Sequence, residues 1–239
     1  IIERLKRTVE HGIFGYSQAK ADYFKAIEGW YGSRFGWKLQ EHWLVRTPGV
    51  VNAIATSIRA FTKEKEAVLI QQPVYPPFRN TVLTNGRRLV NSPLVLRNGR
   101  YEIDFEDFEN KIRKENVKLF VLCSPHNPVG RVWTKEELLK IGEICLRHQV
   151  LVVSDEIHSD FIYPGHVHTV FATIEEAFAQ NSIICTAPSK TFNLAGLQVS
   201  NIIIPNEGLR KRFIEEMHKA AIGGLNIMAL TACQAAYEE

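Results

Sequence analysis

The sequence of 239 residues contains no run of about 18 apolar residues, so we expect no membrane-spanning helix. It has neither an initial Met nor the charged and apolar leader that is typical of a signal peptide. Its four cysteines lack both CxxC spacing and the cysteine and histidine spacing of metal sites. These absences predict reduced thiols, a cytoplasmic location and no structural metal.

The sequence also has little net charge. Its 29 Lys and Arg against 26 Asp and Glu give a formal charge of +3, which is too weak an excess to indicate nucleic-acid binding. No internal repeat or low-complexity linker is visible. A composition with 45% hydrophobic residues is that of a globular protein with one large core. Both ends have the pattern of helix interiors, so we expect a piece of a longer protein.

Short apolar segments typical of strands alternate with amphipathic helical segments. We expect strands at 42–46, 67–71, 87–91, 117–122, 150–154, 182–186 and 198–204. Residues 93–103 are expected to form an exposed excursion with a turn at 97–100. This alternation predicts an α/β fold, in which a mostly parallel seven-stranded sheet lies between two layers of helices.

An acid and a lysine follow two of these strands. Asp155 comes directly after 150–154, and Lys190 follows 182–186 among small and apolar residues, where we expect desolvation to lower its pKa. Open α/β sheets bind ligands outside the carboxyl ends of their strands, so the two side chains can share one crevice. Such a pair is what pyridoxal phosphate requires. The alternatives are a helix cap for Asp155 and a surface charge for Lys190, and Glu156 is expected to be a structural acid.

Other candidate ligand residues lie in loops and at one helix start. Asn127 lies in a loop that prolines and a glycine make rigid, where it presents an amide or simply forms a turn. The helix start at 48–51 offers free backbone N–H groups to a phosphate. Tyr75 could stack on a flat ring or pack in the core. His166 and His168 have no further ligands nearby in sequence, so a loop is favoured over a metal site.

Taken together, these stretches resemble the fold-type I pyridoxal-phosphate enzymes of the class I/II aminotransferase superfamily. The resemblance is strongest to the MalY/PatB subgroup of cystathionine β-lyases, which are carbon–sulfur lyases. The matching stretches are 14–17, 47–51, 72–78, 124–131, 154–158 and 188–197. They cover nearly the whole chain but only part of the family's usual length. The resemblance therefore implies that residues 1–239 form the cofactor-binding large domain, without the small domain and the chain ends.

The resemblance assigns the residues around the cofactor ring. Lys190 would hold pyridoxal 5'-phosphate covalently through its amine and act as the catalytic base. Asp155 would pair with the pyridine nitrogen, and Asn127 would hydrogen-bond the O3′ atom of the ring. Tyr75 would stack on the ring face.

The resemblance also assigns the phosphate contacts. The backbone N–H groups of Val50 and Val51, together with Ser189, would hold the phosphate. Tyr16 would reach the phosphate in the other subunit, so the active unit would be a homodimer. No metal is implied.

Three positions depart from the pattern of typical aminotransferases. Gln198 replaces an arginine that binds the phosphate, and His158, which we expect near the cofactor, replaces a tyrosine. Both differences favour the lyase subgroup. Ala187 stands where a phosphate-binding serine is common, so fewer phosphate contacts are expected. The arginine that grips the substrate carboxylate would lie beyond residue 239.

The resulting hypothesis is a carbon–sulfur β-lyase that acts on cystathionine or a related S-substituted cysteine and releases a thiol, pyruvate and ammonia. An aminotransferase is the main alternative, because it shares the same early chemistry. A regulatory member of the subgroup that binds a protein partner is the alternative from another class. The intact set of Asp155, Lys190 and Asn127 favours catalysis.

Overall fold

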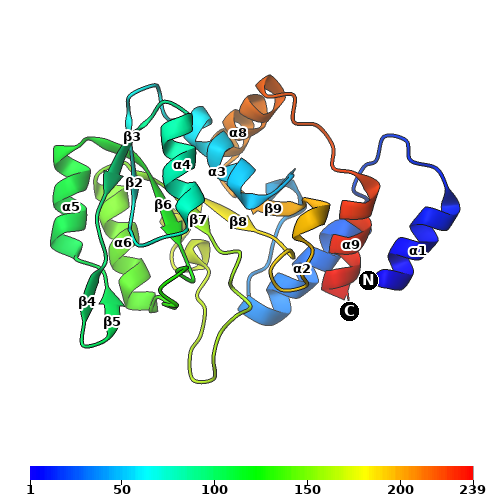
Figure 1. Ribbon diagram of the computed structural model, residues 1–239, viewed down its shortest axis with the longest axis horizontal. Coiled ribbons are helices and arrows are strands. Elements are labelled where there is room, and N and C mark those ends of the chain that lie inside the picture. Colours follow the sequence, from blue (N-terminus) through cyan, green and yellow to red (C-terminus); the bar gives the residue numbers. More distant parts are fainter. Residues whose placement is uncertain (239) are drawn as a thin grey trace.

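The computed structural model describes residues 1–238 and shows a central sheet with helices on both faces (Figure 1). Within this range the sheet has seven strands in the order β1-β9-β8-β7-β6-β2-β3. They are β1 (Leu44–Thr47), β2 (Ala67–Ile70), β3 (Arg88–Asn91), β6 (Val117–Cys123), β7 (Leu151–Asp155), β8 (Ser182–Thr186) and β9 (Ser200–Ile203). Neighbours pair in parallel except at β9, which is antiparallel to β1 and β8. The predicted fold class is therefore confirmed.

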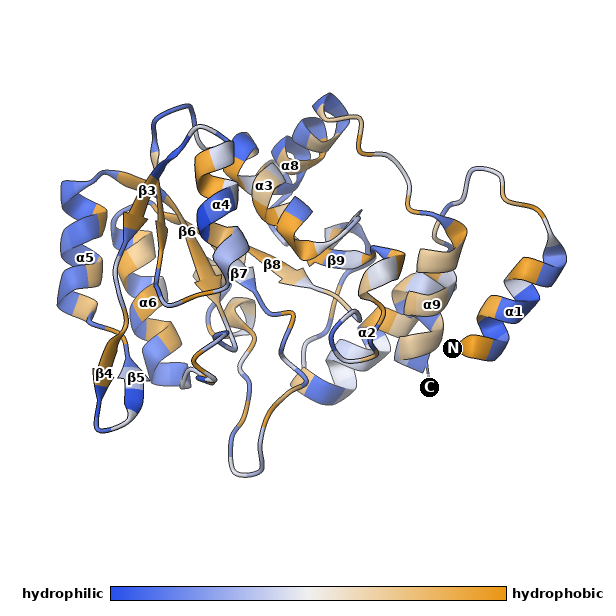
Figure 2. Cartoon of the chain, viewed as in Figure 1, coloured by the Kyte–Doolittle hydropathy of each residue, from blue (hydrophilic) through white to orange (hydrophobic). Residues whose placement is uncertain are grey.

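Side chains of each central strand point alternately into two cores. In β6, Leu119 and Val121 enter one core, and Phe120 and Leu122 enter the other. The first core is closed by α3 (Val50–Phe61), α4 (Pro76–Thr84) and α8 (Glu207–Lys219). The second is closed by α2 (Ala21–Phe35), α5 (Phe105–Lys114), α6 (Lys135–Arg147) and α9 (Ile227–Glu238). Figure 2 shows β6 and β8 almost entirely in the hydrophobic colour, as expected for strands covered on both faces.

Local sequence signals set several helix ends. Thr134 caps α6 in a capping box with Glu137, and Asp104 caps α5, as its position in the sequence predicts. Gly12 and Gly36 end α1 (Ile2–His11) and α2 in the left-handed conformation, with φ of 72° and 63°. Glycine adopts this conformation without steric cost, which explains why both helices stop there.

The structure adds elements that we did not predict. The excursion after β3 is a hairpin of β4 (Val95–Arg97) and β5 (Arg100–Glu102). Its turn residues Asn98 and Gly99 both have positive φ, and the Asn-Gly pair is the usual signal for such a turn. A short helix, α7 (Glu176–Gln180), precedes β8.

None of the helices within residues 1–238 has the length and apolar character needed to cross a bilayer. No group of three or more His, Cys, Asp or Glu side chains within this range is arranged to hold a metal ion. All four cysteines are buried and free of disulfide bonds.

Candidate functional site

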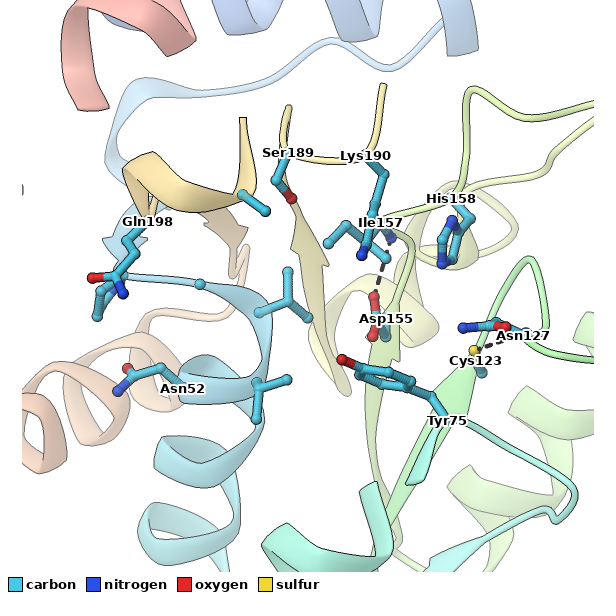
Figure 3. A pocket seen from close by; sticks show the side chains of 15 residues that line it. Asn52, Tyr75, Cys123, Asn127, Asp155, Ile157, His158, Ser189, Lys190 and Gln198 are labelled. Carbon is cyan, nitrogen blue, oxygen red and sulfur yellow. Dashed lines mark hydrogen bonds between the residues drawn. The ribbon is translucent and has the colours of Figure 1, made fainter. Parts of the chain in front are cut away.

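A cavity of about 220 Å³ opens where β6, β7 and β8 end, beside the start of α3 (Figure 3). Its lining includes every predicted site residue except Tyr16: Val50, Val51, Tyr75, Asn127, Asp155, His158, Ser189 and Lys190. Figure 3 shows Asn127 and His158 on one side of Asp155, and Asn52 and Gln198 on the other. The fold thus brings together side chains from five separate segments of the chain.

Asp155 lies at the base of this cavity. It is the last residue of β7, in register with Cys123 on β6 and Cys185 on β8, and it is 6% exposed. Burial raises its pKa to about 7, while the Ile157 N–H, 3.1 Å from Oδ1, and the charge of Lys190 oppose that rise. A turn rather than a helix follows Asp155, so the helix-cap alternative is wrong. A cationic partner would stabilise the ionised form of this buried carboxyl.

Lys190 stands above Asp155 in a turn that follows β8 (Figure 3). Lys190 lines the cavity but is an exposed residue, so the prediction that its surroundings desolvate the amine is wrong. This turn lies on the open side of the cavity. Within the described residues nothing covers the Lys190 amine. Next to it, the Thr191 hydroxyl donates to Asp160 Oδ2 at 2.7 Å and fixes the turn to the segment that follows β7.

Tyr75 and Asn127 come from neighbouring loops. Tyr75 is 37% exposed and lines the cavity, so the alternative of a core aromatic is wrong. The Tyr75 ring packs edge to face against Phe78, with 6.3 Å between the ring centroids, and this contact fixes its orientation at the start of α4. The Asn127 backbone N–H donates to Cys123 Sγ at 3.4 Å, and the Asn127 amide faces the cavity (Figure 3). A flat ligand could therefore lie against Tyr75 with its edge near Asn127.

The start of α3 forms another part of the wall. Gly49 is the N-cap and has φ of 140°, a conformation that L residues rarely adopt. Within the described chain no side chain caps this helix, so the N–H groups of Val50 and Val51 have no acceptor inside it. Uncapped N–H groups at the positive end of a helix dipole suit an anion such as phosphate. Ser189 also lines the cavity.

His158 is half-buried beside Asn127 (Figure 3). Burial lowers its pKa, and the positive charge of Lys190 lowers it further. The imidazole is therefore neutral at neutral pH. A neutral ring can offer one donor and one acceptor to a polar ligand edge.

Glu156 points away from the cavity and is 1% exposed. It accepts hydrogen bonds from Ser154 Oγ at 2.9 Å, from the Phe171 N–H at 3.0 Å and at 2.8 Å from His168 Nε2. The prediction of a structural acid is confirmed. His168 is buried in this contact, whereas His166 is exposed, so the two histidines do not converge on one point.

Four lining residues were not predicted: Asn52, Cys123, Ile157 and Ala195. Cys123 could have been found, because it ends β6 as Asp155 ends β7. Ile157 lies on the opposite side of Asp155 from Tyr75 (Figure 3). Its position two residues after Asp155 is the only sequence signal for it.

Tyr16 lies outside this cavity. It is fully exposed in the loop between α1 and α2, and it lines a separate depression together with Arg7 and Lys20. Tyr16 is not among the residues that line the cavity around Lys190.

A family model described as "Aminotransferase class I and II" matches residues 3–236. The chain belongs to this family. It is 48% identical over 239 residues to cystathionine beta-lyase PatB of Bacillus subtilis, covering 100% of this chain and 62% of that protein.

Solved structures also match this chain along its whole length. A PLP-bound putative aminotransferase from Clostridium difficile has a TM-score of 0.96 at 46% identity, covering 100% of this chain and 61% of the other. Cystalysin from Treponema denticola, which contains pyridoxal 5'-phosphate, has a TM-score of 0.97 at 41% identity, covering 100% and 60%. The chain thus spans about 60% of the length of these relatives.

Proposed function

We propose that the cavity binds pyridoxal 5'-phosphate. The residues fit the group, because the buried carboxyl of Asp155 is suited to a cationic ring nitrogen and the amine of Lys190 is free above it. Asn127 would donate to the O3′ atom, and Tyr75 would lie against one ring face with Ile157 on the other. This proposal is supported above all by Asp155 and Lys190, which line the same cavity.

The other end of the cavity suits the phosphate. The unpaired N–H groups of Val50 and Val51 and the hydroxyl of Ser189 would bind it. Gln198 lines this end without a charge, so fewer strong phosphate contacts are expected than where an arginine is present. His158, as a neutral imidazole, would contact the ring edge beside Asn127.

When bound, the cofactor supplies an electron-withdrawing ring that stabilises negative charge at the Cα of an amino acid. The amine of Lys190 would take the Cα proton, since it stands on the open side of the cavity where a substrate enters. Asp155, as a carboxylate, would keep a proton on the ring nitrogen and so maintain the positive charge there. Tyr75 and Ile157 would prevent the ring from tilting.

We propose that the whole protein is a carbon–sulfur β-lyase acting on cystathionine or a related S-substituted cysteine. Once Lys190 has taken the Cα proton, the Cβ–S bond would break, the sulfur would leave with the electron pair as a thiolate, and the proton held by Lys190 would convert it to the thiol. Water then completes the release of pyruvate and ammonia. Support comes from the 48% identity to a cystathionine beta-lyase over the full chain.

The experiment is to incubate full-length, purified protein with cystathionine and no added keto acid. Formation of pyruvate and free thiol in equal amounts supports the lyase, and a Lys190→Ala variant, lacking the base, serves as the inactive control. An aminotransferase is the second candidate, favoured by the 46% identity to a putative aminotransferase. Amino-group transfer that depends on a keto acid, with no thiol, would establish that candidate instead.

We also propose a homodimer in which Tyr16 reaches the phosphate in the other subunit's cavity. Tyr16 is fully exposed and lies away from the cavity of its own chain. In α1 no residue is buried, and Ile2, Leu5 and Val9 line a shallow apolar depression. A second copy would cover this apolar surface.

We further propose that residues 1–239 are the large, cofactor-binding domain of a cytoplasmic enzyme. The domain assignment is supported by the match to about 60% of each relative's length. The location is supported by four cysteines that are all buried and unpaired, as reducing conditions favour.

A further inference from the structure

Two loops at the edge of the cavity are tied directly to each other. The loop after β2 carries Tyr75, and the loop after β6 carries Asn127. The Tyr75 N–H donates to the Asn127 carbonyl oxygen at 3.0 Å. Close by, the imidazole Nε2 of His126 lies 2.9 Å from the carbonyl oxygen of Pro73. Two hydrogen bonds thus join the segment 73–75 to the segment 126–127.

The ring of His126 is held firmly on its other sides. It is 2% exposed and meets Trp133 edge to face at 5.5 Å, with the ring planes at 86°. Trp133 is itself fixed, because its Nε1–H donates to the Cys123 carbonyl oxygen at 2.9 Å and the Arg131 guanidinium lies 4.5 Å from its ring. The His126 backbone N–H donates to the Arg131 carbonyl at 2.8 Å. The imidazole therefore has one orientation.

The surroundings of the His126 imidazole determine which of its nitrogen atoms carries a hydrogen. A carbonyl oxygen only accepts, so Nε2 of His126 carries the hydrogen that it donates to Pro73. The Nδ1 atom is buried and has no hydrogen-bond partner within residues 1–238. Burial lowers the pKa of His126 to about 4, although the carbonyls of Pro73 and Gln71 oppose that shift, and the charge of Arg131 adds to it. The ring is neutral at neutral pH.

We propose that His126 is a positioning residue for the cofactor, which acts by fixing the Tyr75 loop against the Asn127 loop. This inference rests on the proposed function, because it takes Tyr75 and Asn127 to contact the face and the edge of one ring. A shift of either loop relative to the other would weaken one of those contacts. His126 itself does not line the cavity that holds Asp155 and Lys190.

The test uses two variants of the full-length protein. His126→Phe keeps a flat ring against Trp133 but removes the N–H, whereas His126→Gln offers an amide N–H with similar reach. Cofactor-stripped protein is titrated with pyridoxal 5'-phosphate, and binding is followed by quenching of tryptophan fluorescence. We expect roughly five- to tenfold weaker binding for His126→Phe, the size of one hydrogen bond, and recovery of most of the affinity in His126→Gln.

A matched control separates positioning from a general loss of stability. Asn206→Ala removes the cap of α8, whose side chain accepts the Leu209 N–H at 3.0 Å, and it touches neither loop. This control should bind the cofactor as tightly as the wild type. In a Tyr75→Ala background, His126→Phe should weaken binding less than twofold further, because the residue it positions is absent. An undiminished five- to tenfold effect there, or none in the wild-type background, would overturn the proposal.

Amide hydrogen exchange of cofactor-free protein gives a readout that does not depend on binding. Peptides that contain Tyr75 should exchange several-fold faster in His126→Phe than in Asn206→Ala, while peptides from α8 should not. Equal exchange at Tyr75 would contradict the coupling of the loops. If the wild type fails to bind pyridoxal 5'-phosphate, the proposed function fails and the cofactor role of His126 with it, whereas normal binding with an unaffected His126→Phe variant refutes only the positioning role.

Discussion

The carboxyl group of Asp155 and the amine of Lys190 face one cavity (Figure 3). Asp155 is the last residue of β7, and Lys190 lies in the turn that follows the adjacent strand β8. Because these strands run in parallel, their carboxyl ends meet at one edge of the sheet, and residues far apart in sequence become neighbours. Asp155 is buried and Lys190 is exposed, so the acid is fixed while the amine stays accessible. This asymmetry suits an anchored ring that is approached from the side of the amine.

The buried acid predicts a specific dependence of stability on pH. Burial raises the pKa of Asp155 from 3.8 to about 7, so between these values the native state binds more protons than the unfolded state. The free energy of unfolding should therefore fall as pH rises from about 4 to about 7, by on the order of 3 kcal/mol at most. Asp155→Asn should remove this fall in cofactor-stripped, full-length protein. Urea unfolding of both proteins at several pH values measures it, and parallel pH curves would contradict the assigned burial cost.

A close contact between α6 and α7 predicts a severe effect of one methyl group. A Cβ added at Gly142 would lie 2.2 Å from the ring of Phe178. Gly142→Ala should lower the free energy of unfolding by about 1–3 kcal/mol, because the ring is fully buried and has to move. Gly29→Ala in α2 is the matched control, since nothing lies within 4 Å of the added atom. It should be neutral or stabilising by about 0.5–1 kcal/mol, and thermal or urea unfolding compares the two.

The start of α3 predicts an effect on cofactor affinity. Gly49 has φ of 140°, and no atom lies within 4 Å of a Cβ placed there, so only the backbone conformation opposes a side chain. Alanine at position 49 would be strained by about 1–3 kcal/mol in this backbone conformation. Gly49→Ala should therefore shift the N–H groups of Val50 and Val51. Titration with pyridoxal 5'-phosphate should show weaker binding, whereas pyridoxal without the phosphate should bind as it does to the wild type. Equal weakening for both ligands would argue against a phosphate seat at this helix.

The proposed dimer predicts complementation between two inactive variants. Tyr16→Ala removes the contact made to the other subunit, and Lys190→Ala removes the catalytic amine. A mixed dimer then has one intact site, with Lys190 from the first variant and Tyr16 from the second. Refolding an equal mixture should restore about a quarter of wild-type lyase activity, since half of the dimers would be mixed and each has one of two sites. No recovery in a mixture that forms dimers would place Tyr16 outside the other subunit's site.

Much of the fold could be predicted because the relevant signals are local. The period of apolar residues located the seven strands of the central sheet, and capping residues such as Thr134 and Asp104 located helix starts. The reversed direction of β9 could not be read, because a single strand's apolar run is the same in either orientation. The β4–β5 hairpin was missed although Asn98 and Gly99 signal it, because its strands are short and exposed.

In the candidate site, too, the residues with local sequence signals could be predicted, and the contacts between distant segments could not. Asp155, Asn127 and Tyr75 were found because each follows a buried strand, where an open sheet exposes its ligand side. The exposure of Lys190 was not foreseen, since the surrounding small residues indicate an apolar setting but not which side of the turn remains open. Nor could the sequence show that His126 and Pro73 hydrogen-bond across two loops. That contact depends on how β2 and β6 lie side by side.

We propose above all that Lys190 carries the cofactor opposite Asp155. The most direct measurement is reduction of the full-length protein with borohydride after incubation with pyridoxal 5'-phosphate, followed by peptide mass mapping. We predict a single pyridoxyl adduct on the peptide that contains Lys190, and none in the Lys190→Ala variant treated in the same way. Absence of an adduct on that peptide, or an equal yield on another lysine in both proteins, would contradict the account.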